Sequence, residues 1–63
     1  MREQTKRMLR LLHKEQSVTD MQANDAGVIN PRREAGLLIR REGQKINIHK
    51  HSYSKREYQL INS

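Results

Sequence analysis

The chain has 63 residues, of which 33% are hydrophobic and 32% are charged. Such a chain forms one small domain, over residues 1–63 with frayed ends at 1–4 and 62–63, and it has few apolar residues for a deep catalytic pocket. The absence of cysteine excludes disulfides and thiolate metal sites. No apolar run approaches a membrane span, and no secretory signal is evident. We therefore expect a cytoplasmic binding module rather than an enzyme.

Thirteen Lys and Arg residues against seven Asp and Glu residues give a net charge of +6, which is spread unevenly. Residues 1–14 hold five basic residues and one acidic residue, whereas residues 15–31 hold three acidic residues and no Lys or Arg. Residues 32–63 are basic again. This pattern predicts a polarised surface with one face suited to a polyanion. The alternative is that the charge only keeps a small protein soluble.

A first helix is predicted over residues 5–14, where Met8, Leu11 and Leu12 follow the i, i+3, i+4 spacing of one helix face. Basic residues fill the opposite face of this helix. Residues 17–19 then form a short break between helices, as a strand or a turn.

A second helix is predicted over residues 20–25, because Thr19 followed by Gln22 has the form of a capping box. Gly27 would end this helix, since glycine tolerates the left-handed conformation of a C-terminal cap. The expected buried residues are Met21 and either Ala23 or Ala26.

Asn30 followed by Pro31 is the clearest helix start in the chain, because Asn caps free amides and Pro at the first position loses no hydrogen bond. This predicts a third helix over residues 31–42 that stops at Gly43. Its buried stripe would be Ala35, Leu38 and Ile39. The residues expected on the opposite side are Arg33, Gly36, Leu37 and Arg40.

After Gly43 the apolar pattern changes to the period of a strand. Residues 45–49 and 57–60 alternate with period two around the polar, basic residues 49–56, which predicts a β-hairpin. The hairpin residues expected to face the core are Ile46, Ile48, Tyr58 and Leu60. One core joining helices and hairpin is expected from Leu12, Leu38, Ile39, Ile48 and Leu60.

This order of elements resembles the winged helix-turn-helix family over residues 5–61, and most of all the small helix-turn-helix proteins of bacteriophages and prophages. The matching runs are Ser17-Val18-Thr19, Ala26-Gly27-Val28-Ile29-Asn30, Leu38-Ile39-Arg40-Arg41-Glu42-Gly43-Gln44-Lys45-Ile46 and Arg56-Glu57-Tyr58-Gln59-Leu60. The resemblance implies an α+β fold of three helices followed by a two-stranded hairpin wing, and double-stranded DNA as the partner.

The resemblance also implies that residues 31–42 are a recognition helix in the major groove and that the basic wing, residues 49–56, contacts the backbone or the minor groove. The DNA-binding candidates are Arg32, Arg33, Gly36, Leu37, Arg40, Arg41, Lys50, Tyr53, Lys55 and Arg56. Arg33 and Arg40 are placed to read guanine or hold phosphates. Leu37 could contact a thymine methyl, pack on the wing or form a protein interface. The alternative for the charged positions is a solvated surface.

No catalytic motif accompanies the available serines and histidines, so neither catalysis nor a cofactor is expected. His49 and His51 could join His13 in a metal site, but no cysteine or nearby acidic residue completes it. The expected function is that of a phage-type transcriptional regulator or architectural factor, acting on the host nucleoid as a homodimer or a cooperative array. The alternative is a phage-encoded protein that binds and inhibits a host protein through the same basic face.

Overall fold

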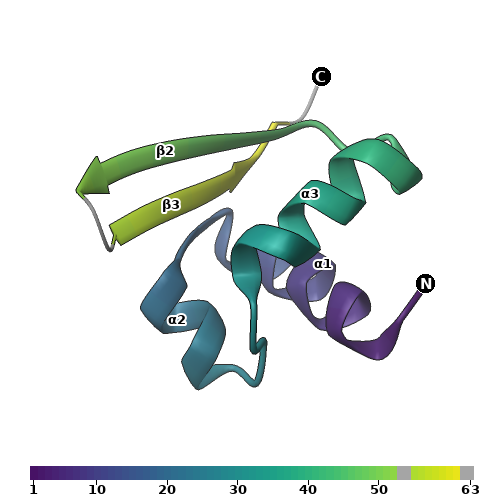
Figure 1. The fold of residues 1–63 in the computed structure, drawn as a ribbon, viewed down its shortest axis with the longest axis horizontal. Coiled ribbons are helices and arrows are strands. Elements are labelled where there is room, and N and C mark those ends of the chain that lie inside the picture. Colours follow the sequence, from purple (N-terminus) through teal and green to yellow (C-terminus); the bar gives the residue numbers. More distant parts are fainter. Residues whose placement is uncertain (53–54, 62–63) are drawn as a thin grey trace.

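The computed structural model describes residues 1–52 and 55–61. The elements are α1 (Glu3–Glu15), β1 (Ser17–Thr19), α2 (Asp20–Asp25), α3 (Pro31–Glu42), β2 (Ile46–Ser52) and β3 (Lys55–Leu60). The strands form an antiparallel sheet in the order β1-β3-β2, and the helices lie on one side of it (Figure 1). The fold is therefore α+β, as the sequence predicts.

The sheet has three strands, so the prediction of a two-stranded hairpin is wrong in its strand count. Gln16, with a φ of 63°, turns the chain from α1 directly into β1. Val18 then lies opposite Tyr58 in the register of β1 with β3. Three residues are too few to show a period-two pattern, which is why the sequence left this segment between strand and turn. The pairing attaches the hairpin to the helical part of the fold.

Side-chain caps define the helices that the sequence predicts best. The Thr19 hydroxyl accepts from the Gln22 N–H at 3.1 Å, and the Gln22 side chain accepts from the Thr19 N–H at 2.9 Å. Asn30 Oδ1 accepts from the Arg33 N–H at 3.3 Å, and Gly43 ends α3 with a φ of 67°. Both α2 and α3 therefore have their predicted bounds, whereas α1 is longer than predicted at both ends.

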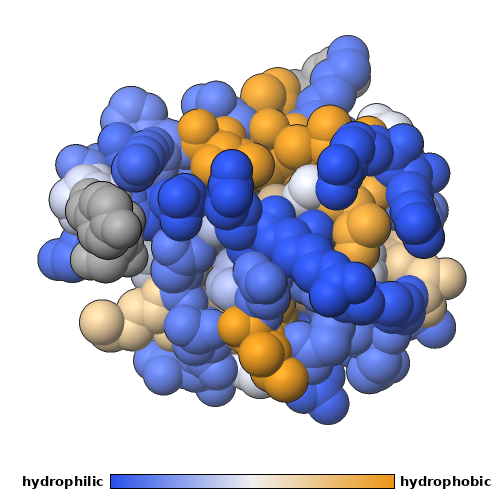
Figure 2. Space-filling model, viewed as in Figure 1, coloured by the Kyte–Doolittle hydropathy of each residue, from blue (hydrophilic) through white to orange (hydrophobic). Residues whose placement is uncertain are grey.

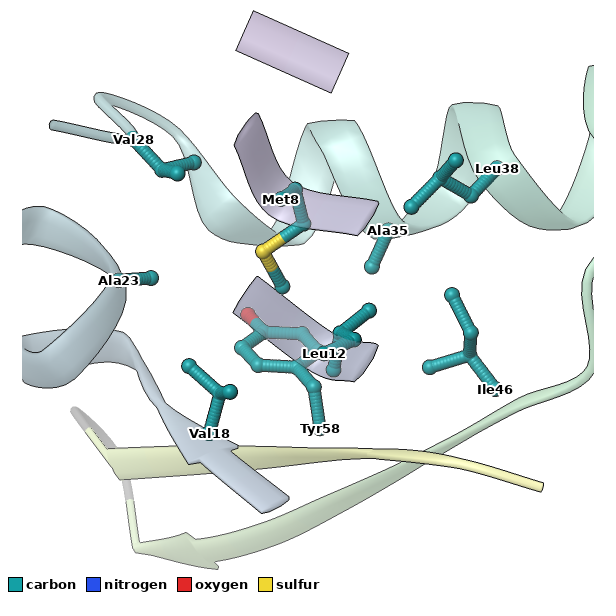
Figure 3. Packing of buried hydrophobic residues seen from close by; sticks show 9 residues of the cluster. All are labelled: Met8, Leu12, Val18, Ala23, Val28, Ala35, Leu38, Ile46 and Tyr58. Carbon is teal, nitrogen blue, oxygen red and sulfur yellow. The ribbon is translucent and has the colours of Figure 1, made fainter. Parts of the chain in front are cut away.

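One apolar core fills the space between the helices and the sheet (Figure 3). Its buried members are Met8, Leu12, Val18, Ala23, Val28, Ala35, Leu38, Ile46 and Tyr58. Leu60 packs against this cluster but is only partly buried. The core joins all three helices to all three strands, so the hairpin and the helices form one cooperative unit.

Three residues predicted to be buried lie at the surface: Met21, Ile39 and Ile48. Of the two alternatives Ala23 and Ala26, Ala23 is the buried one. The six residues of α2 make fewer than two turns, so only Ala23 reaches the core. Ile39 is turned by about 100° from the buried Leu38 and faces β2 instead of α1. Beyond Ile46, β2 runs past the helices, so Ile48 is half-exposed.

None of the helices within the described ranges combines the length and the apolar character needed to cross a membrane.

Candidate nucleic-acid interface

An open hollow of about 500 Å³ lies between the outer side of α3 and β2. Its lining residues are Asn30, Arg32, Arg33, Gly36, Ile39, Arg40 and Ile48. Arg33, Gly36 and Arg40 follow the i, i+3, i+7 spacing of one helix stripe. The hollow therefore gathers four of the ten candidates named from the sequence, namely Arg32, Arg33, Gly36 and Arg40.

Gly36 keeps the floor of this hollow open. A Cβ at this position would meet only the Arg40 guanidinium, at 3.6 Å, so packing does not require glycine here. Glycine inside a helix costs about 1 kcal/mol relative to alanine. Its small size leaves the backbone of α3 accessible from the hollow.

The arginines of the hollow are cations at the surface of α3. Arg32, Arg33 and Arg40 are exposed, and none of them forms a salt bridge with an acidic residue in the described part of the chain. The salt bridges found there belong to Arg2, Arg7, Arg10 and His51. Three such cations around one concave surface create a positive potential that attracts a polyanion.

Ile39 and Ile48 give the hollow an apolar part that the sequence analysis missed. They are 37% and 38% exposed. Arg32, Gly36 and Ile39 follow the i, i+4, i+7 spacing of one flank of α3, and this spacing is the signal that could have placed Ile39 beside the arginines. In Figure 2 the front of the molecule shows hydrophobic patches beside hydrophilic surface. Such a combination suits base edges and thymine methyl groups.

Two other candidates on α3 point away from the hollow. Leu37 and Arg41 follow i, i+4 spacing and line a separate recess with Met1, Arg2 and Thr5. Leu37 follows Arg33 by one helical turn, but it is turned toward the start of α1 and does not line the hollow.

The basic residues of the hairpin lie on strands rather than in a loop. Lys50 pairs with Arg56, and Ser52 pairs with Lys55, with a register irregularity between Lys50 and Ser52. Alternation along β2 puts Lys50 on the same face as Ile48, so Lys50 continues the side of the hollow along the strand. Tyr53, the remaining candidate, lies outside the described residues.

Asp20 holds β3 to the start of α2. The Tyr58 hydroxyl donates to Asp20 Oδ1 at 2.6 Å, and the Arg56 backbone N–H donates to Oδ2 at 3.2 Å. Burial and the hydrogen bond to Asp20 raise the pKa of Tyr58, so the phenol is a protonated donor at neutral pH. The basic hairpin is thus fixed relative to the helices.

The outer face of the sheet carries a polar chain. The Ser17 hydroxyl donates to Glu57 Oε2 at 2.7 Å, and His51 Nε2 lies 3.0 Å from Glu57 Oε1. These two hydrogen bonds lower the pKa of Glu57. The carboxylate separates the hydroxyl from the imidazole, so this is not a nucleophile–base pair. In the described part of the chain, no group of three or more His, Cys, Asp or Glu residues is arranged to hold a metal ion.

No family model matches the chain, and neither a curated protein nor a solved structure matches it. Its function is therefore inferred from the hollow itself.

Proposed function

We propose that this protein is a small winged helix-turn-helix domain that binds double-stranded DNA. The observation that carries the proposal is the hollow, in which three arginines without salt bridges to described residues surround two half-exposed isoleucines. Helix α3 would enter the major groove as the recognition helix. The β2–β3 hairpin would be the wing on the backbone or the minor groove.

The dimensions of α3 support this placement. A helix with its side chains is about 10–12 Å across, which fits the width of the major groove, about 12 Å. Arg33 and Arg40 are separated by about 10 Å along the helix axis, which is the rise of about three base pairs. Both guanidinium groups can therefore meet guanine edges or phosphates within one stretch of groove. Ile39 and Ile48 would contact thymine methyl groups beside them.

Most of the affinity would come from cations on phosphates, while α3 would supply the sequence preference. One 63-residue module reads only a few base pairs, so we propose that it acts as a homodimer or a cooperative array. This function fits a transcriptional regulator or an architectural factor.

The test is a titration of labelled duplexes at several salt concentrations, followed by fluorescence anisotropy. One duplex carries a site selected from a random pool, and the other has random sequence. We expect log K to fall by several units for a tenfold rise in salt. Arg40→Gln should weaken binding to the selected site more than Arg41→Gln, which removes the same charge outside the hollow.

A separate variant tests the wing. Lys55→Ala should weaken binding to both duplexes equally and lower the salt slope by about one, since a single phosphate contact is lost. If no duplex binds at about 50 mM salt while a host protein is captured, the basic hollow serves as an inhibitor surface for that protein instead.

A further inference from the structure

A second basic surface lies on α1. Arg7, Arg10 and Lys14 follow i, i+3, i+7 spacing and line a hollow of about 240 Å³ with Leu11 and Ala26, where α1 meets the end of α2. This surface shares no residue with the hollow between α3 and β2. It is therefore a separate place where an anion can bind.

The two basic surfaces point away from each other. Helix α1 buries Met8 and Leu12, and Arg10 and Lys14 lie about half a turn away from these residues. Helix α3 likewise buries Ala35 and Leu38 and exposes its arginines on the opposite side. Figure 1 shows α1 behind α3, with the two helices packed together. Cations thus line the outer sides of one packed pair of helices.

The surface on α1 keeps most of its charge. Glu3 lies 3.6 Å from Arg7 and 3.2 Å from Arg10, and its side chain is 62% exposed. One exposed carboxylate shared by two arginines compensates them weakly. Lys14 forms no salt bridge to an acidic residue among the described ones, and Lys6 adds a further exposed cation on this helix.

We propose that the α1 surface binds the phosphate backbone of a second DNA duplex, so that one protein bridges two duplexes. This inference rests on the proposed function, which assigns the first duplex to α3. Within residues 1–52 and 55–61, the exposed large hydrophobic residues all lie outside α1. Protein interfaces usually need such anchors, whereas a phosphate backbone needs only cations and no sequence readout. The composition of this surface therefore favours DNA over an acidic protein.

The experiment separates bridging from binding. One unlabelled duplex is fixed to beads, a second labelled duplex is added in solution, and its capture by the protein is measured. In parallel, anisotropy reports binding to a single duplex. Arg10→Gln/Lys14→Gln should lower capture about tenfold and change single-duplex binding less than about threefold, because only second-site phosphate contacts are lost. Arg7 is kept, because its guanidinium packs over Gly27.

Lys45→Gln is the matched control for Lys14→Gln, since Lys45 is exposed and lines neither hollow. Capture should fall for Lys14→Gln and stay unchanged for Lys45→Gln, with equal melting temperatures. Bridging by a homodimer through two copies of α3 would survive the α1 changes, and that result would overturn the inference. The inference would also be overturned if the wild type bound a single duplex but captured no labelled second duplex. If the wild type did not bind a single duplex at all, that result would instead contradict the proposed function.

Discussion

The charged residues on the two sides of α3 have opposite surroundings. On the inner side, Glu34 is 2% exposed, accepts from the Thr5 hydroxyl at 2.6 Å and forms a salt bridge with Arg2. On the outer side, Arg33 and Arg40 have no salt bridge to a described residue. The buried charge of this helix is thus fully partnered and serves the fold, whereas the exposed charge is left available for a ligand.

Replacing neighbouring residues on α3 tests this division most strongly. Leu38 is fully buried, so Leu38→Ala should lower the free energy of unfolding by about 2–5 kcal/mol and unfold much of so small a domain. Ile39 is half-exposed in the hollow, so Ile39→Ala should cost about 1 kcal/mol or less. Urea denaturation of both variants gives the two values. Equal costs would show that Ile39 belongs to the core after all.

The inner side can be tested through its ion pair. Arg2→Ala should lower the free energy of unfolding by about 2 kcal/mol, because the buried Glu34 carboxylate loses its counter-charge. Glu34→Gln should cost less than Arg2→Ala, since no charge then stays buried. In the double variant, Arg2→Ala should cost little beyond Glu34→Gln alone. Thermal unfolding of the three variants checks this order, and fully additive losses would contradict a coupled pair.

The outer side can be tested through DNA affinity. Arg33→Ala and Arg40→Ala should each cost about 1–3 kcal/mol of binding free energy on a selected site and much less on random duplex. The melting temperatures should stay unchanged, since neither guanidinium is bonded within the described part of the fold. Paired titrations on both duplexes measure the difference. Equal losses on the two would mean that α3 only holds phosphates, as in an architectural protein.

The apolar part of the hollow can be tested by a smaller change, which is made in the DNA. Replacing thymine by uracil in the selected site removes only a methyl group and should cost about 0.8 kcal/mol per methyl that Ile39 or Ile48 contacts. In the Ile48→Ala variant, replacing the thymine that Ile48 contacts by uracil should no longer change the binding free energy. Met21→Ala, which changes an exposed residue outside the hollow, should preserve it. A wild-type protein that binds both duplexes equally would exclude methyl contacts.

The smallest expected effect is a pH dependence of stability that comes from Glu57 on the outer face of the sheet. The pKa of Glu57 is lower in the folded chain than its ordinary value of 4.5. The carboxylate therefore stabilises the fold above that value, and this contribution is lost as the pH falls through the lowered pKa. In the Glu57→Gln variant, the melting temperature should fall less steeply as the pH decreases through this acidic range. An unchanged acid profile would show that Ser17 and His51 do not act on Glu57 in solution.

Much of the helical part could be predicted because its signals are local. The caps at Thr19 and Asn30 act within three residues, and Gly43 adopts the left-handed conformation that its position suggests. The alternation around Ile46 and Tyr58 likewise locates the two long strands and two residues of the core. Short-range backbone chemistry of this kind is readable from sequence alone.

The missed features depend on contacts between distant segments. The pairing of β1 with β3 joins residues about 40 positions apart, which no local period reveals. The exposure of Ile39 and Ile48 depends on how far β2 extends beyond the helices. The local apolar pattern contains no information on this extension, so it predicted both residues to be buried. The sequence therefore named four of the residues that line the hollow, Arg32, Arg33, Gly36 and Arg40, but not its apolar part, Ile39 and Ile48.

The attachment of β3 has a mechanical consequence. Strand β1 holds one edge of β3, and Asp20 holds both the Tyr58 side chain and the Arg56 backbone. In the proposed complex, recognition helix and wing strands thus keep a set spacing before DNA arrives. Any mismatch between that spacing and the groove must be absorbed by the duplex, through its flexible pyrimidine–purine steps. The stiffness of bases that the protein never touches would then contribute to its choice of site.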